Sequence, residues 1–228
     1  MKLFYTPIPY LIHKAQVAAI HAGVYEKLER IPTNPFKRDP AHVAANPLSK
    51  VPTLVLDDGT PLYGGPVIYE YLDSLHNGPK LFPASGPERW LVLRRLALAD
   101  GMWDVAVQRE GESGRPAEFQ YAAEIEKHGA TVNRCLDQME KEASTYRGFT
   151  IDQVSAACGL MYFDRLVMLK RPGAADWRPG RPTLAAWYQE FVKHPAMRPH
   201  DNEFRAAFNE GDTRSRWGTA NALRPPAG

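Results

Sequence analysis

The chain has 228 residues, of which 44% are hydrophobic and 24% are charged, and this composition excludes a disordered or low-complexity protein. Lys and Arg number 28 against 26 Asp and Glu, so the net charge of +2 predicts no basic surface for nucleic acid or an anionic membrane. No apolar run approaches the roughly 20 residues that span a bilayer, and the first residues do not resemble a signal peptide. We therefore expect a soluble, cytoplasmic protein.

Strand-like and helix-like patterns alternate over the first eighty residues. The patterns predict a strand at 2–5, a helix from Ile12 to Ala22 that stops at Gly23, a strand at 25–31, at most a short helix at 41–45, strands at 51–56 and 61–63, and a helix at 66–75. The pair Asp58-Gly59 between the last two strands is a strong hairpin signal. The predicted order is βαβ, a loop, and ββα.

The remainder of the chain changes character. Long amphipathic segments separated by Gly and Pro predict helices at 88–107, 116–145, 151–170 and 182–193, and no strand pattern occurs among them. We therefore divide the chain into an α/β domain at 1–78, a linker at 79–86 and an all-helical domain at 87–228.

Two further local features are interpreted as structural. Thr150 followed by Gln153 forms a capping box, with Phe149 and Val154 as a hydrophobic staple, which predicts the start of a central buried helix. The two cysteines, Cys135 and Cys158, lack the paired spacing of a zinc site and lie in apolar helical patterns. We expect both to be buried apolar side chains, and no metal is predicted.

The segment Asn46-Pro47-Leu48-Ser49-Lys50-Val51-Pro52-Thr53-Leu54 resembles the cytosolic glutathione S-transferases, in which a thioredoxin-like domain precedes an all-α domain. The opening residues 1–7 are similar to the bacterial beta class. Residues 96–101, 149–151 and 176–187, with His194-Pro195, also match the family in order. The resemblance implies a thioredoxin-like fold with a helical bundle, and glutathione as co-substrate.

The resemblance implies a cis bond before Pro52, which would present the backbone of Val51 to the cysteinyl part of glutathione. It also implies a hydroxyl or thiol near the end of the first strand that favours the glutathione thiolate. One match to the family places Thr6 at that position and another places Tyr10 there, and both stay open. Tyr5 is expected to be a core residue.

The sequence departs from the family at Gly64-Gly65-Pro66. An acidic residue followed by Ser usually occupies the first two positions and binds the γ-glutamyl end of glutathione. Either the free N–H groups of the following helix still hold a carboxylate, with one donor lost at Pro66, or glutathione binding is weakened or lost. Asp100, Lys50 and His13 are candidates for compensation. For Asp100 the alternative is a partnership with Arg94 or Arg95 on its own helix.

The resemblance places the electrophile between the domains, on the first long helix of the bundle, where Trp103, Met102 and Val107 are the candidates. It implies a homodimeric detoxifying transferase that attacks a small hydrophobic electrophile with glutathione. The alternative is a glutathione S-transferase-like binding or regulatory protein without catalysis. Thiol-disulfide reduction is disfavoured, because no cysteine lies near the first strand.

Overall fold

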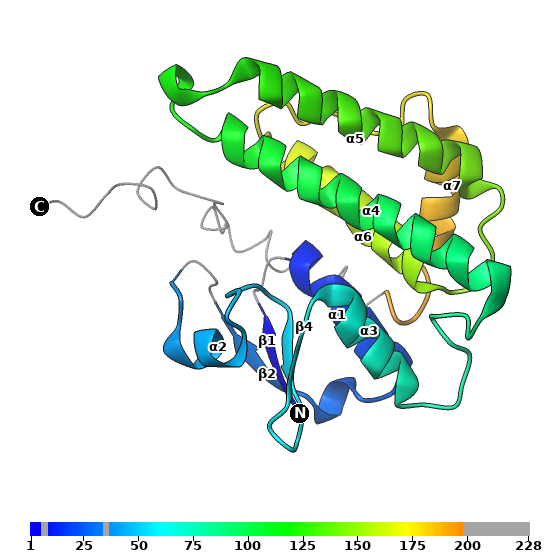
Figure 1. Cartoon of the computed structure of the whole chain (residues 1–228). Helices are drawn as coiled ribbons and strands as arrows, with labels where there is room; N and C mark the ends of the chain where they lie inside the picture. The colour runs from blue at the N-terminus through cyan, green and yellow to red at the C-terminus, as the bar shows by residue number, and fades with distance from the viewer. Residues whose placement is uncertain (6–8, 34–36, 198–228) are drawn as a thin grey trace, which may run out of the picture.

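The structure is a computed structural model that describes residues 1–5, 9–33 and 37–197, and the side chains of these residues except 9–13. The α/β region contains the following elements: β1 (Lys2–Tyr5), α1 (Pro9–His21), β2 (Glu29–Pro32), α2 (Pro40–Ala45), β3 (Thr53–Val55), β4 (Pro61–Tyr63) and α3 (Gly65–Ser74). The helical region contains α4 (Gly86–Ser113), α5 (Ala122–Ala143), α6 (Ile151–Met168) and α7 (Pro182–Phe191). Short 3-10 turns occur at Tyr25–Lys27 and Ala117–Phe119. In Figure 1 the sheet and its helices form one body and the long helices a second one above it.

The sheet has the strand order β2-β1-β3-β4, with β1 parallel to β2 and antiparallel to β3. Leu3 and Leu54 face each other across β1 and β3 and are fully buried, as the apolar pattern of these strands predicts. The hairpin signal is confirmed, because β3 and β4 are antiparallel neighbours and Gly59 adopts a positive φ of 87° in the turn. This is the βαβ-ββα arrangement of a thioredoxin-like domain with a helical bundle after it.

The strand predicted at 25–31 is confirmed only in its second half. The segment 25–31 was expected to be extended throughout, but Tyr25–Lys27 form a 3-10 turn and only Glu29–Pro32 pair with β1. The side chains explain the difference. The Tyr25 hydroxyl accepts hydrogen bonds from Gln16 of α1, at 3.0 Å, and from Arg30, at 2.6 Å, which holds the start of the segment against the helix.

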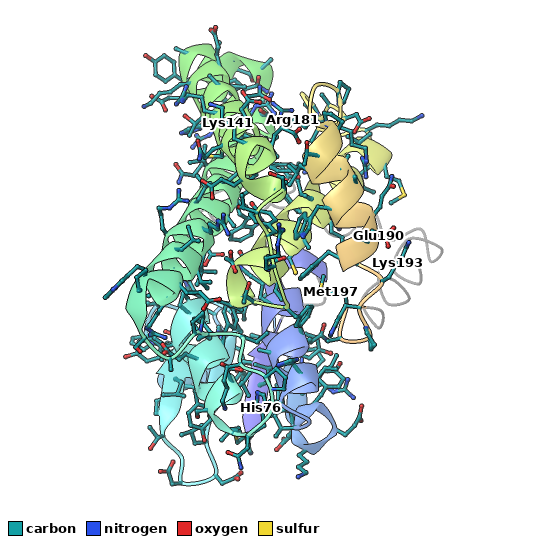
Figure 2. The ribbon with its side chains drawn as sticks, turned by 90° about the vertical axis from the view of Figure 1, so that its right-hand side faces the viewer. His76, Lys141, Arg181, Glu190, Lys193 and Met197 are labelled. Carbon is teal, nitrogen blue, oxygen red and sulfur yellow. The ribbon has the colours of Figure 1, made fainter. Side chains whose placement is uncertain are left out.

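Helix α6 is buried along most of its length, as expected for the central helix, and packs on α4 and α7, while α5 packs on α4 and α7. Helices α4 and α1 both pack on α6, so α6 also joins the two regions. The start of α7 lies beside α5, with Arg181 near Lys141 in the view of Figure 2. Arg181 forms an ion pair with Asp137 of α5 at 2.7 Å. At the other end of α7 Glu190 and Lys193 form an exposed ion pair. Within the described ranges, no helix has both the length and the apolar character that are needed to cross a bilayer.

The connection between the regions is tied to the end of α3. The buried carboxylate of Asp73 accepts hydrogen bonds from the backbone N–H groups of Leu81 and Phe82 at 2.9 and 3.1 Å. Helix α3 ends at Ser74 and α4 begins at Gly86. We keep the division into 1–78, 79–86 and 87–228 as a proposal.

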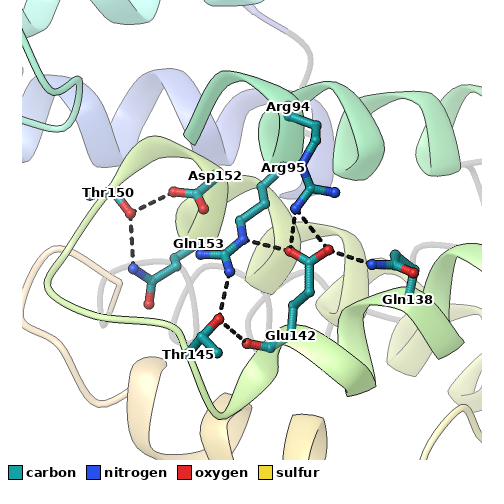
Figure 3. Close-up of polar contacts among 8 residues, drawn as sticks. All are labelled: Arg94, Arg95, Gln138, Glu142, Thr145, Thr150, Asp152 and Gln153. Atoms are coloured by element: carbon teal, nitrogen blue, oxygen red, sulfur yellow. Dashed lines mark hydrogen bonds and ion pairs between the residues drawn. The ribbon is translucent and has the colours of Figure 1, made fainter. Parts of the chain in front are cut away.

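The capping box predicted the start of α6 correctly but not its hydrogen bonds. Thr150 is the N-cap residue, yet its side chain makes no capping hydrogen bond to the helix backbone. Its hydroxyl instead donates to Asp152, at 2.5 Å, and accepts from the Gln153 side chain, at 2.9 Å (Figure 3). The buried Asp152 carboxylate competes for the hydroxyl that a capping box would use.

Candidate functional site

The turn before β3 carries the predicted cis peptide bond, between Val51 and Pro52. Side chains beneath the turn hold the preceding carbonyl: the oxygen of Lys50 accepts from Asn46 Nδ2 at 3.0 Å and from Thr53 Oγ1 at 2.9 Å, and lies 3.1 Å from His42 Nε2. Neither the N–H nor the C=O of Val51 is bonded to another described residue. The turn therefore offers a backbone donor and acceptor to a peptide-like ligand.

A cavity of about 210 Å³ opens beside this turn, between the two regions of the chain. Its walls come from the cis turn, from the start of α3, from α1 and from the middle of α4. The lining residues are Lys14, Val51, Pro52, Gly65, Pro66, Tyr69, Asp100, Trp103 and Asp104. Five residues that the sequence analysis proposed for the site therefore line one cavity: Val51, Pro52, Gly65, Asp100 and Trp103.

Tyr69 explains why residue 65 is a glycine. A Cβ atom on Gly65 would lie 2.5 Å from the Tyr69 hydroxyl oxygen and 2.8 Å from its Cζ, distances that no real side chain tolerates. The tyrosine is one turn further along α3, so its ring points back over the start of the helix. Gly64, the N-cap residue, has a positive φ of 88°. The phenol therefore occupies the space into which a serine at position 65 would extend.

Burial raises the pKa of Tyr69, an effect that the nearby positive charge of Lys14 only partly offsets. The phenol is 2% exposed. A tyrosine with a raised pKa stays protonated at neutral pH and remains a hydrogen-bond donor. The start of α3 thus keeps a hydroxyl donor at the cavity, supplied from position 69.

A charged group links the two regions at the floor of the cavity. Lys14 Nζ of α1 lies 2.6 Å from Asp100 Oδ1 of α4, and Ser155 of α6 donates to the same oxygen at 2.5 Å. The Lys14 side chain is 8% exposed and its ammonium lies 6.0 Å from the centre of the Trp103 ring. The alternative prediction, that Asp100 pairs with Arg94 or Arg95 on its own helix, is wrong, because both arginines pair with Glu142.

Asp104 adds a second carboxylate to the same wall. Desolvation in the cavity and the neighbouring charge of Asp100 raise its pKa, while the positive charges of Lys14 and Lys50 act in the opposite direction. One cation, Lys14, and two carboxylates therefore line the cavity, while Lys50 lies outside the lining and acts on Asp104 only through its charge. This set suits a ligand that carries charges of both signs.

Not every candidate belongs to the cavity. Met102 is 1% exposed and its Cε lies against Gly159 of α6, so it packs inside the bundle and does not line this space. Val107 is half-buried and does not line it either. Thr6 lies outside the described residues, as do the side chains of Tyr10 and His13.

Three lining residues were missed by sequence reasoning: Lys14, Tyr69 and Asp104. Tyr69 carried a usable signal, because a bulky side chain four positions after a glycine at a helix start leans over it. Lys14 and Asp104 carried none, since an isolated charge on a helix is normally solvated. Their role depends on the contact between α1 and α4.

Neither cysteine lies at this cavity. Cys158 is fully buried in α6, where burial raises the pKa of its thiol to about 12, so the expectation of a buried apolar side chain is confirmed there. Cys135 is partly exposed, so for this residue the expectation is only partly met.

One group of side chains has the composition of a metal site. His21, Asp73 and His76 present ligand atoms within 4.8 Å of one another at the junction of α1, α3 and the linker. These atoms already serve the fold: His21 Nε2 lies 2.7 Å from the carbonyl oxygen of Pro79, and His76 Nε2 lies 3.1 Å from the Asp73 carboxylate. We interpret the group as a structural junction.

Comparisons with known proteins identify the family. Residues 11–75 match the family described as "Glutathione S-transferase, N-terminal domain". The chain is 29% identical to the uncharacterized GST-like protein YibF of Escherichia coli K12, over 81% of this chain and 90% of that protein. It is 34% identical to a glutathione transferase family member of Pseudomonas fluorescens Pf-5, whose crystal structure contains bound glutathione; the match has a TM-score of 0.76 and covers 86% of this chain and 96% of that one.

A second crystal structure, of a glutathione S-transferase from Methylobacillus flagellatus KT with glutathione bound, is 30% identical. It has a TM-score of 0.77 and covers 87% of this chain and 98% of the other. Both crystal structures are matched over nearly the full length of their chains. The chain belongs to the glutathione S-transferase family.

Proposed function

We propose that the chain binds glutathione in the cavity between its two regions and activates the thiol for attack on a small hydrophobic electrophile. The observation that carries this proposal is the joint lining of the cavity by the cis Val51-Pro52 turn, the start of α3 and the charged residues of α1 and α4. The relatives from Pseudomonas fluorescens and Methylobacillus flagellatus, both described with bound glutathione, support the same ligand.

The charges of the cavity complement those of glutathione, which carries two carboxylates and one ammonium group. In our proposal the free backbone groups of Val51 pair with the cysteinyl unit. The start of α3 and the Tyr69 hydroxyl receive one carboxylate, and Asp100 or Asp104 receives the ammonium. Lys50 is exposed beside the turn, and in our proposal it binds the other carboxylate.

The chemical step is the attack of a thiolate. The bound thiol loses its proton to solvent, and a sulfur lone pair forms the new S–C bond with the electrophile. A leaving group then departs with its electron pair, or the acceptor carbon takes up a proton. Thr6 and Tyr10 remain the proposed donors to the sulfur, and the turnover rates of the Thr6→Ala and Tyr10→Phe variants would distinguish them. Trp103 lines the cavity and is the proposed contact for the electrophile.

At the start of α3, Gly64 and Gly65 replace the acidic residue and serine that are usual in the family. This difference supports a second candidate function, that of a binding protein without catalysis. The space beyond Gly65 is filled by the ring of Tyr69, so the γ-glutamyl end of glutathione meets a different surface from the usual acidic residue and serine. A ligand held there in a shifted position would keep its affinity and lose the alignment of its sulfur.

The thiol pKa of bound glutathione separates the two candidates without knowledge of the electrophile. We expect isothermal titration to detect glutathione, and the thiolate absorbance of the bound ligand to titrate well below its value in solution. Absence of binding at about 10 mM would contradict both candidates. Binding with an unchanged thiol pKa would support the binding protein.

Tyr69→Phe tests the role of the phenol. Loss of one hydrogen bond to a charged group predicts an affinity for glutathione about tenfold weaker. Tyr71→Phe is the matched control, because Tyr71 lies on the same helix, packs against the core and does not line the cavity. Equal affinities for the two variants would remove Tyr69 from the proposed binding site.

We also propose a homodimer that covers the exposed apolar side chains of β4, α3 and the start of α4. Trp90 is 70% exposed and Val67 is 54% exposed, and Arg89 pairs with Glu70 at 2.7 Å, which holds α3 against α4. Light scattering on a sizing column should give twice the chain mass, and Trp90→Glu should give the monomer. Phe119→Glu, at a similarly exposed ring in the 3-10 turn that follows the far end of α4, is the control.

A further inference from the structure

A second cavity, of about 260 Å³, lies inside the helical region. It is bounded by the last turns of α4, the middle of α5, the end of α6 and the loop that follows α6. None of its lining residues lines the cavity beside the cis turn. On α4, Ala106, Arg109 and Glu110 face this second cavity, whereas Asp100, Trp103 and Asp104 face the first. The two spaces thus lie on different faces of one helix.

The wall of the second cavity is mostly apolar. A single aromatic ring or a short branched chain matches its size, which lies just below the range of about 300–1,000 Å³ for pockets that hold drug-sized ligands. The apolar lining residues are Ala106, Val132, Leu136, Phe163, Leu166, Pro172, Ala174, Ala175 and Trp177.

Most of the charged side chains on this wall have partners. Glu110 pairs with Arg171 at 2.7 Å and also accepts a hydrogen bond from Tyr162, and Asp176 pairs with Arg178 at 3.0 Å. Arg109 differs from them. Its Nη1 donates to the carbonyl oxygen of Gly173 at 3.0 Å, but it forms no ion pair with any described carboxylate. Its buried Nε has no hydrogen-bond acceptor.

Two glycines make room for the Arg109 guanidinium. A Cβ on Gly129 of α5 would lie 3.2 Å from Nε, and a Cβ on Gly173 would lie 2.5 Å from Nη2. Gly173 also adopts a positive φ of 71°. The chain thus keeps an arginine without a counter-ion at this cavity, and an anion bound there would supply the acceptor that its buried Nε lacks.

We propose that this cavity is a binding site for a small organic carboxylate with an apolar body, separate from the proposed glutathione site. The carboxylate would lie at Arg109, since guanidinium groups bind carboxylates with charge-assisted hydrogen bonds. The apolar body would pack between Val132, Phe163 and Leu166. The guanidinium of Arg109, which has no carboxylate partner among the described residues, favours an anion over a neutral molecule of the same shape.

Fluorine NMR titration of 4-fluorophenylacetate into the full-length protein tests the proposal. We expect saturable binding in the range of about 0.1–1 mM, and binding of the neutral 4-fluorophenylacetamide about tenfold weaker. Saturating glutathione should leave the titration unchanged. This arm separates the proposal from the proposed function, because the carboxylate site would persist even if glutathione did not bind.

Two variants locate the site. Arg109→Gln should weaken 4-fluorophenylacetate binding by about tenfold or more, and Val132→Phe should do the same by filling the cavity. Arg94→Gln is the matched control, on the same helix with the same change in charge, and should bind as the parent chain does. The second variant keeps the test decisive if Arg109→Gln fails to fold.

Three results would overturn the proposal. These are the absence of binding at about 5 mM, an unchanged affinity in both Arg109→Gln and Val132→Phe, and displacement of the carboxylate by glutathione. The last result would assign the binding to the cavity beside the cis turn.

Discussion

At the start of α3, the hydroxyl of Tyr69 occupies the space that a side chain at position 65 would need. Position 65 has no side chain, and the hydroxyl of Tyr69 lies where a side chain at 65 would begin. The two residues depend on each other. The Tyr69 ring fits only if residue 65 is a glycine, and a glycine at position 65 would leave a gap if the ring were absent. The pair therefore behaves as one structural unit.

Gly65→Ala should destabilise the chain by about 1–3 kcal/mol, because its Cβ has no room beside a ring that is itself buried. In a Tyr69→Leu background the same change should cost much less, and urea unfolding of the four variants measures the difference. Gly101→Ala is the control: Gly101 lies in α4 with no atom near its Cβ position, so alanine there should stabilise by about 0.5–1 kcal/mol. If Gly65→Ala lowered the free energy of unfolding equally in both backgrounds, the two residues would not form one structural unit.

At the scale of elements, short-range patterns predicted which segments are helices and strands, and long-range contacts decided the rest. The Asp-Gly turn was predictable because the chemistry that fixes it lies within a few residues, whereas the cis bond before Pro52 was expected from the resemblance of residues 46–54 to the family. The 3-10 turn at 25–27 was not, since it depends on side chains of α1 and β2. The pairing of Lys14 with Asp100 spans 86 positions, so no local pattern indicates it.

Helices α4 and α5 are joined by a carboxylate with several donors. Glu142 of α5 accepts from Arg94 at 2.8 Å, from Arg95 at 2.6 Å and from Gln138 at 2.5 Å, and its side chain is 12% exposed (Figure 3). Desolvation alone would raise the pKa of Glu142. The hydrogen bonds from the two arginines and the glutamine outweigh it and lower the pKa from 4.5 to about 2.

The lowered pKa predicts a pH dependence of stability. Because the folded state holds the proton less tightly than the unfolded chain, the contribution of Glu142 is complete above about pH 4.5 and is lost as the pH falls towards 2. Glu142→Gln should reduce the free energy of unfolding at neutral pH by about 1–3 kcal/mol, and its difference from the parent chain should shrink over that acid range.

Urea unfolding at a series of pH values measures this difference. Glu190→Gln removes a carboxylate from the exposed pair with Lys193 and should differ from the parent by less than about 0.5 kcal/mol at every pH. A difference between Glu142→Gln and the parent that stays constant from pH 5 to about 2 would contradict the lowered pKa.

At the scale of the whole molecule, the cavity proposed for glutathione exists only because the two regions meet. The α/β region supplies the cis turn, the start of α3 and Lys14, while α4 supplies Asp100, Trp103 and Asp104. Helix α1 packs on α6, and the Lys14–Asp100–Ser155 group joins α1, α4 and α6 at the floor of the cavity. The ion pair is thus part of the interface between the regions and part of the candidate site.

A double-mutant cycle on Lys14→Met and Asp100→Asn measures how strongly the regions are joined there. The pair is largely enclosed and hydrogen-bonded to Ser155, so we expect a coupling free energy of about 1–3 kcal/mol from urea unfolding. The exposed pair of Lys127 and Glu124 on α5 is the control, with an expected coupling below about 0.5 kcal/mol. Equal coupling free energies for the two pairs would contradict this expectation. Apolar contacts between α1 and α6 would then hold the interface, and the Lys14–Asp100 pair would contribute only to the candidate ligand site.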